Sequence, residues 1–196
     1  MYKKQVNLQK VLCIGTLIVC ALIFLYSLGI MTDLYDALYN TIRNPDKLEK
    51  TTVTGSRIYY DMQGFNKDFL HAAIGMLILT LSLFVTNTHT RRRYYVGNFA
   101  ATGLVAAGGI VFTVWAHKQI ELFKAQFLQI NFEELLANAT KKKSLYTEST
   151  FWFDIHYLVF GLLIVCIVLL IANLIWKCML MKEEQSLVAK GKEASA

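Results

Sequence analysis

Four stretches of this sequence are apolar and long enough to cross a membrane, and this constrains the fold more than any other feature. A helix needs about 20 mostly apolar residues to span the hydrocarbon core. None of the four stretches contains Pro or has a charged residue near its centre. The sequence therefore predicts an all-α polytopic membrane protein, with residues 1–196 forming a single four-transmembrane-helix bundle. The predicted spans are 11–31, 69–86, 94–116 and 152–176.

Charged residues outside these spans predict how the chain is oriented. Cytoplasmic segments of membrane proteins are enriched in Lys and Arg, so we expect both termini, the loop 87–93 and the tail 177–196 to face the cytoplasm, across a plasma membrane. The first span is longer than the apolar part of a signal peptide and is expected to be retained. The net charge of +6 then reflects topology and contact with anionic lipids of the bilayer, and not nucleic-acid binding. The basic residues that set this prediction are Lys3, Lys4, Lys10, Arg91, Arg92, Arg93 and, in the tail, Lys177, Lys182, Lys190 and Lys192.

The two long connections, 32–67 and 117–151, are expected to form an extracellular cap. In the first, Thr32 or Asp33 could begin a separate short helix, and the residue types at 51–60 favour extended structure. In the second, apolar residues at spacings of three and four predict that the third helix continues beyond its span. Their stripe needs a cover, which is either this chain or a partner protein. The stripe consists of Ile120, Phe123, Phe127 and Ile130.

Small residues concentrate in the third span. Membrane helices associate by close packing, which small side chains permit. The third helix is therefore expected either at the centre of the bundle or against a helix of another protein. Together with the aromatic segment 145–153, this face is the candidate helix-packing or partner interface. Its predicted members are Gly97, Ala101, Gly103, Ala107, Gly108, Phe123, Phe127 and Trp152.

Two similar phrases carry most of the polar residues that could form a site: KDFLHAAIGMLIL at 67–79 and FWFDIHYLVFGLL at 151–163. Asp68 and Asp154 match at one offset, but His71 and His156 differ from that offset by one residue, which is about 100° around a helix. With His117, these side chains allow two interpretations. They are wetted or hydrogen-bonded groups at the membrane interface, with both Asp near helix N-termini. Alternatively, they form a heme, quinone or metal site of a redox subunit.

The sequence offers no catalytic constellation. Its four cysteines, Cys13, Cys20, Cys166 and Cys178, form no CxxC motif and are expected to be small apolar packing residues. There is no ionisable residue near the centre of a span for a proton relay, no helix broken by Pro and no Walker motif. We therefore expect a non-enzymatic protein without a cofactor.

Three stretches carry a resemblance to a known group of proteins: IYYDMQGFN at 58–66, TNTHTRRRYY at 86–95 and LYTESTFWFD at 145–154. The chain resembles small four-span membrane proteins encoded among carbohydrate ABC-importer genes of Gram-positive bacteria, from the second span onward more than before it. The resemblance implies an accessory subunit that associates with the importer's permeases, and possible contact with its solute-binding protein. It implies no residue-level site. A self-associating, claudin-like tetraspan structural protein is a further alternative.

Overall fold

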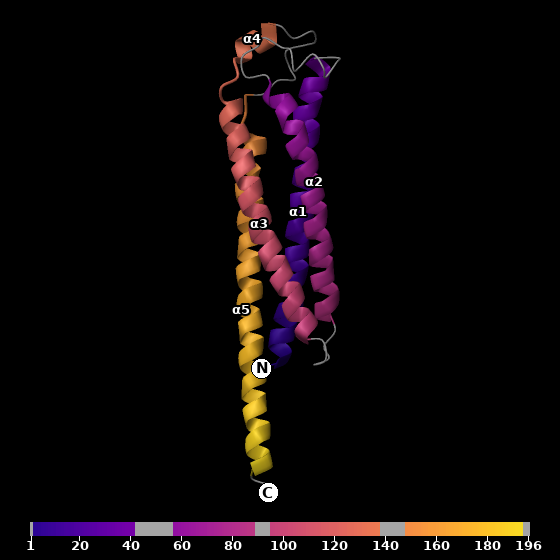
Figure 1. Cartoon of the computed structure of the whole chain (residues 1–196), viewed down its shortest axis with the longest axis vertical. Helices are drawn as coiled ribbons and strands as arrows, with labels where there is room; N and C mark the ends of the chain where they lie inside the picture. The colour runs from indigo at the N-terminus through magenta and orange to yellow at the C-terminus, as the bar shows by residue number, and fades with distance from the viewer. Residues whose placement is uncertain (1, 42–56, 89–94, 138–147, 194–196) are drawn as a thin grey trace. The chain divides into compact units, whose positions relative to one another are not determined.

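The computed structural model describes residues 2–41, 57–88, 95–137 and 148–193, and all regular structure within these residues is α-helical (Figure 1). Four of the helices are long and apolar enough to cross a membrane, as the sequence predicts. Their candidate spans are Lys3–Gly29, Asp61–Asn87, Gly97–Phe127 and Phe151–Ala189. The all-α, four-helix membrane fold is therefore confirmed. The helices are α1 (Tyr2–Thr41), α2 (Ile58–Thr88), α3 (Tyr95–Phe127), α4 (Phe132–Ala137) and α5 (Phe151–Glu193).

Two local predictions in the first connection are wrong. No separate helix begins at Thr32 or Asp33, because α1 continues without a break to Thr41. The residues from 30 to 41 include neither Pro nor Gly, so nothing in the backbone forces the helix to end there.

The prediction of extended structure at 51–60 is wrong for the residues of this stretch that the structure describes, because α2 already begins at Ile58. Buried apolar residues recur at spacings of four, three and four at Ile58, Met62, Phe65 and Phe69. This helical period overrides the strand propensity of Ile and Tyr. Residues 42–56 and 138–147 of the predicted cap, and 89–94 with the three arginines of the predicted cytoplasmic loop, lie outside the described residues.

The helices contribute to two compact units. Unit 1 combines the segments Met1–Cys20, Met76–Ile110 and Leu162–Ala196, and unit 2 combines Ala21–Gly75 and Val111–Gly161. Each long helix contributes one part to each unit. Along the chain, α1 and α3 begin in unit 1 and end in unit 2, whereas α2 and α5 begin in unit 2 and end in unit 1. Each unit therefore contains a part of every long helix.

Unit 1 is held by an apolar cluster and by a network of side-chain amides. In the apolar cluster, residues from all four long helices are buried together: Cys13, Leu83, Ala101, Val105 and Leu170. In the amide network, Gln5 Nε2 donates to Gln9 Oε1 at 3.0 Å and to Asn173 Oδ1 at 3.4 Å. Gln9 Nε2 donates to the Oδ1 atoms of Asn87 and Asn98, the latter at 2.9 Å. The amide network therefore joins α1 to each of the other three long helices.

Unit 2 has an aromatic core. The Phe69 ring is fully buried and lies 5.5 Å from the rings of Phe65 and Phe112, measured between centroids. Tyr26 meets it edge-on, and its hydroxyl donates to the Trp152 backbone carbonyl at 2.8 Å. A Cβ on Gly29 would lie 2.8 Å from the Trp152 indole, so glycine is what permits this close approach. These contacts fix α1, α2, α3 and α5 around one cluster of rings.

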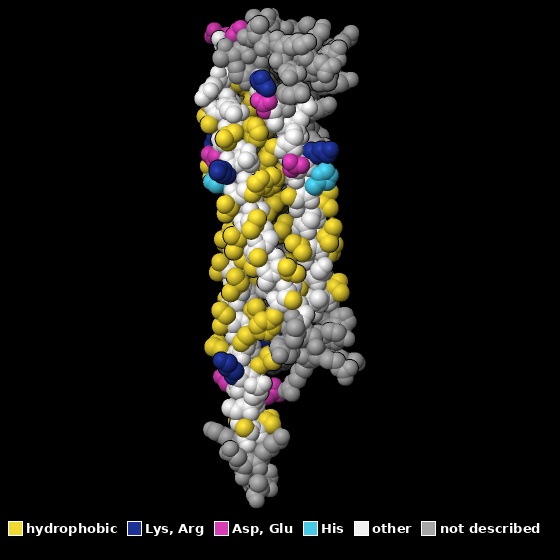
Figure 2. Space-filling view, viewed as in Figure 1, with side chains coloured by type: hydrophobic (Ala, Val, Ile, Leu, Met, Phe, Trp, Pro, Cys, Tyr) yellow, Lys and Arg dark blue, Asp and Glu magenta, His cyan; other side chains and the backbone are white. Residues whose placement is uncertain are grey.

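The surface of the helices is strongly apolar. Large hydrophobic side chains are exposed along all four long helices, and Figure 2 shows them in yellow over much of the visible face. A protein in water rarely exposes contiguous apolar surface on this scale. The buried amides and the exposed aliphatic side chains together are the pattern of a bundle whose outer faces contact lipid.

Candidate functional site

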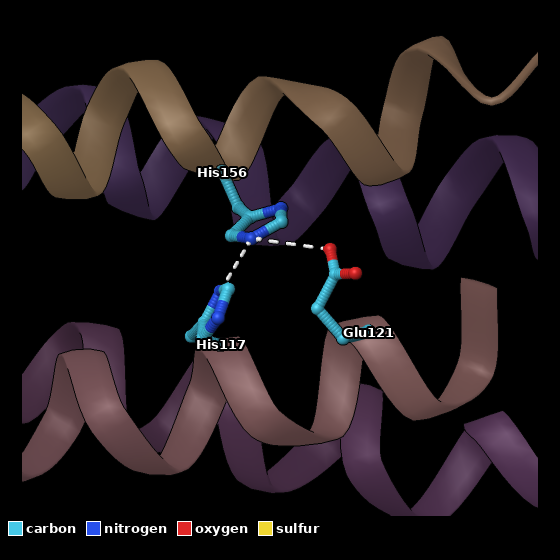
Figure 3. Close-up of side chains that lie close together, drawn as sticks. All are labelled: His117, Glu121 and His156. Atoms are coloured by element: carbon cyan, nitrogen blue, oxygen red, sulfur yellow. Dashed lines mark hydrogen bonds and ion pairs between the residues drawn. The ribbon is translucent and has the colours of Figure 1, made fainter. Parts of the chain in front are cut away.

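Unit 2 contains a cluster of two histidines and a glutamate, with side chains that converge between α3 and α5 (Figure 3). His117 and Glu121 lie four residues apart on α3, so they project from the same face of that helix. His156 projects toward them from α5. His117 Nδ1 lies 2.9 Å from His156 Nε2, and Glu121 Oε1 lies 3.7 Å from the same His156 nitrogen. One potential ligand atom from each residue lies within 4.8 Å of the others.

His156 is the fixed member of this cluster. Its side chain is 0% exposed, and its Nδ1 pairs with the backbone carbonyl of Phe153 in the preceding turn of α5. A carbonyl oxygen can only accept a hydrogen bond, so Nδ1 carries the hydrogen of the neutral His156 ring. The other ring nitrogen, Nε2, therefore carries a lone pair. That lone pair points at His117 and Glu121. His117 Nδ1–H therefore donates to His156 Nε2.

The charged neighbours of the cluster are paired with one another. Lys124 Nζ lies 2.5 Å from Asp154 Oδ1, and the Thr150 hydroxyl donates to Asp154 Oδ2 at 2.7 Å. The Tyr157 hydroxyl donates to Glu121 Oε1 at 2.7 Å. Asp154 is therefore paired with Lys124 and with Thr150, the residue before α5, whereas Glu121 lies toward His156.

The structure brings together some of the polar residues that the sequence singled out and separates others. His117 and His156 meet, and Asp154 lies nearby in the ion pair with Lys124. His71 and Asp68 are exposed on α2 and belong to no such cluster among the described residues. Glu121 was missed by the sequence reasoning. The signal for it was its spacing of four from His117 on a helix that was expected to continue.

The two histidines of this cluster are not placed to bind the two faces of one heme. Iron in heme takes its axial ligands from opposite sides of the porphyrin plane, whereas the two imidazoles here contact each other directly. Their ring centroids are 5.1 Å apart and their planes are inclined by 38°. Two imidazole nitrogens and a carboxylate instead form a ligand set suited to a small transition-metal ion.

The predicted small-residue face of α3 divides into two sides. Ala101 is buried in the apolar cluster of unit 1, and Gly108 is half-buried, where a Cβ would lie 3.3 Å from Leu79 Cδ1. Gly97, Gly103 and Ala107 are exposed, and no atom lies within 4 Å of a Cβ built on Gly97 or Gly103. The exposed side of α3 within unit 1 therefore carries small residues, and at Gly97 and Gly103 no described atom lies close to it.

The aromatic members of the predicted interface lie inside unit 2. Phe123 is buried against Phe65, and Phe127 is buried between Phe132 and Phe153. Trp152 is partly buried against Gly29. The apolar stripe that continues α3 is thus covered by this chain, so the aromatic residues of the stripe do not provide a surface for a partner.

Comparisons of the chain with family models, with curated proteins and with solved structures give no match. Two features of the described residues are candidate functional surfaces. One is the exposed small-residue side of α3 in unit 1, and the other is the His117–Glu121–His156 cluster in unit 2.

Proposed function

We propose that this chain is a non-enzymatic accessory subunit of a bacterial membrane transporter, specifically a carbohydrate ABC importer, and that it packs against the permease subunits through α3. It would reside in the plasma membrane with both termini in the cytoplasm. The three stretches that resemble importer-associated four-span proteins motivate the transporter class. The observation that supports a lateral partner is the exposure of Gly103 and Ala107, together with the open space beside Gly103.

The physical argument concerns how helices associate in lipid. Lipid tails are as apolar as Leu or Val, so an exposed aliphatic side chain gains little by exchanging lipid for protein. Small residues act differently, because they allow two helix backbones to approach and to form many short van der Waals contacts. On α3 the small residues share one exposed face with larger aliphatic ones, which could form the edges of a groove for a partner helix. The exposed positions of this face are Gly97, Ala100, Gly103, Leu104, Ala107, Ile110, Val111 and Val114.

The test is to change this face without changing the fold. In the double variant Gly103→Leu/Ala107→Leu, both positions are exposed and a Cβ at position 103 has no neighbour within 4 Å, so the isolated chain should retain its stability. Affinity purification from a bacterial host that carries the importer, in mild detergent, would be followed by mass spectrometry. We expect near-stoichiometric permease, ATPase and solute-binding subunits with the original chain, and a large loss of all three with the double variant.

The matched control is Gly161→Leu. Gly161 is also exposed, and a Cβ built there also has no neighbour within 4 Å, but it lies on α5. The control should keep the full yield of complex. An unchanged yield with the double variant would remove α3 as the interface. Recovery of the original chain alone, or only with copies of itself, would contradict the importer proposal, and the second result would favour a self-associating structural protein.

A further inference from the structure

We propose that His117, Glu121 and His156 bind one divalent transition-metal ion, with Zn²⁺ as the ion that fits best. The ligand atoms are His117 Nδ1, a Glu121 carboxylate oxygen and His156 Nε2. Among the described residues, this is the one place where three such side chains converge. This site is independent of the α3 face proposed above as the partner interface, since it lies in unit 2 and that face lies largely in unit 1.

The spacing of the ligand atoms is close to what a tetrahedral ion requires. Zinc–nitrogen and zinc–oxygen bonds are about 2.0–2.2 Å long, so two ligands of one tetrahedron lie about 3.3 Å apart. The observed separations from His156 Nε2 are 2.9 Å to His117 and 3.7 Å to Glu121. The separation to His117 must open and the separation to Glu121 must close by a few tenths of an ångström. The third separation, between His117 and Glu121, is at most 4.8 Å and must close toward the same value. Small side-chain rotations of His117 and Glu121 would accomplish this while buried His156 stays in place.

The second coordination shell is already present. A histidine that binds metal usually donates its other ring N–H to a carboxylate or a backbone carbonyl, which fixes its tautomer and its orientation. His156 does this through Nδ1 and the Phe153 carbonyl. The carboxylate ligand is oriented in the same way, because the Tyr157 hydroxyl donates to Glu121 Oε1. Both interactions orient ligand atoms toward the position between α3 and α5 where an ion would sit.

The local charge balance also favours a cation. Glu121 supplies one negative charge, and two neutral imidazoles add none. The nearest lysine in the cluster, Lys124, is held by Asp154 at 2.5 Å, so its positive charge is offset by a carboxylate. The bound ion would replace the hydrogen bond between the two histidines and would connect α3 to α5. His117 would change tautomer, so that its hydrogen lies on Nε2 and the Nδ1 lone pair faces the ion, and both imidazoles would stay neutral.

The ligand types select the class of ion. Ca²⁺ and Mg²⁺ prefer six or more oxygen ligands, whereas imidazole with carboxylate suits zinc and neighbouring first-row metals. Exposed His117 and half-exposed Glu121 leave one side of the site accessible to a free ion. With three protein ligands, a water molecule would complete the tetrahedron, as it does in other zinc sites with an open position.

The test measures metal binding by the full chain, purified in detergent with an affinity tag that contains no histidine. Zn²⁺ is titrated into metal-stripped protein in competition with a chromophoric chelator, and Co²⁺ is used as a visible probe of tetrahedral coordination. We expect one Zn²⁺ per chain and tetrahedral Co²⁺ absorption bands. The variants are His117→Ala and Glu121→Gln, and the matched control is His71→Ala, an exposed histidine on α2. Each ligand variant should weaken Zn²⁺ binding by at least about 10-fold, because loss of even an outer-shell partner of a metal site costs at least that much affinity. The His71→Ala control should bind Zn²⁺ as the original chain does.

A thermal-shift measurement keeps the result independent of folding defects. His156→Ala would leave a cavity in a fully buried position and could unfold the chain, so the exposed and half-exposed ligands carry the test. Zn²⁺ should raise the melting temperature of the original chain and of His71→Ala, but not that of His117→Ala or Glu121→Gln, and Mg²⁺ should raise none of them. Binding by the original chain that equals binding by His117→Ala, or equal loss in His71→Ala, would overturn the site.

Discussion

Replacement of Gln9 by Met tests whether the amide network holds unit 1 together. Gln9 is 5% exposed on α1, and its side chain makes three hydrogen bonds. It accepts one from Gln5 Nε2 and donates to the Oδ1 atoms of Asn87 on α2 and Asn98 on α3. Met has nearly the same shape and volume but neither the amide donor nor its carbonyl oxygen. The substitution therefore removes the hydrogen bonds while it leaves the packing almost unchanged.

The magnitude follows from the number of bonds. Side-chain hydrogen bonds between membrane helices contribute about 0.6 kcal/mol each on average, and about 1.7 kcal/mol at most. Two of the three bonds join helices, those to Asn87 and Asn98, and they give an expected loss of about 1.2 kcal/mol in the free energy of unfolding, with about 3.4 kcal/mol as the upper bound. Part of this loss arises because the buried carbonyl oxygens of Asn87 and Asn98 lose a donor.

The assay is equilibrium unfolding of the detergent-solubilised chain by increasing SDS, followed by far-ultraviolet circular dichroism. Leu8→Met is the matched control, because Leu8 is the adjacent residue of α1 and is 41% exposed. The control should change the free energy of unfolding by less than about 0.5 kcal/mol, the usual range for surface substitutions. If Gln9→Met and Leu8→Met destabilise the chain equally little, the amide network does not hold these helices together.

One further substitution in each unit tests its packing, and both are measured by the same SDS unfolding. Phe69→Ala should lower the free energy of unfolding by about 3–5 kcal/mol, because Phe69 lies fully buried at the centre of the aromatic core; a loss below about 1 kcal/mol would mean that this core is not formed as described. Gly109→Leu should lower the free energy of unfolding by about 1–3 kcal/mol through overpacking, because even a Cβ there would lie 2.6 Å from Ile167 Cδ1. The control, Gly103→Leu on the open side of the same helix, should leave the free energy of unfolding almost unchanged. Equal effects at the two glycines would contradict the assignment of the inner and outer sides of α3.

The four membrane helices could be predicted from the sequence because each is encoded locally. A run of about 20 apolar residues specifies a span whatever lies beside it, and the repeat of Ile120, Phe123 and Phe127 correctly extended α3 beyond its apolar window. Local signals for helix ends were less informative. Thr32 and Asp33 could cap a helix, but a cap has no effect where the preceding helix simply continues.

The candidate metal cluster could not be predicted from the sequence, because it depends on register between two helices far apart in the chain. His117 and His156 meet only because α3 and α5 pack at one particular height and rotation. The one-residue mismatch between the offsets of Asp and His showed only that His71 and His156 are not equivalent. The glycines show the same limit, since their spacing does not reveal that Gly103 faces outward whereas Gly109 faces Ile167.

The most direct test of the central claim is photo-crosslinking in living cells from the exposed side of α3. A photoreactive amino acid would replace Leu104, which is 60% exposed beside Gly103, and Val168 on α5, which is 58% exposed, would serve as the control position. An accessory subunit bound through α3 predicts a covalent adduct between position 104 and an importer permease, with little or none from position 168. The absence of a permease adduct from position 104, or an adduct only with a second copy of this chain, would contradict the proposed function.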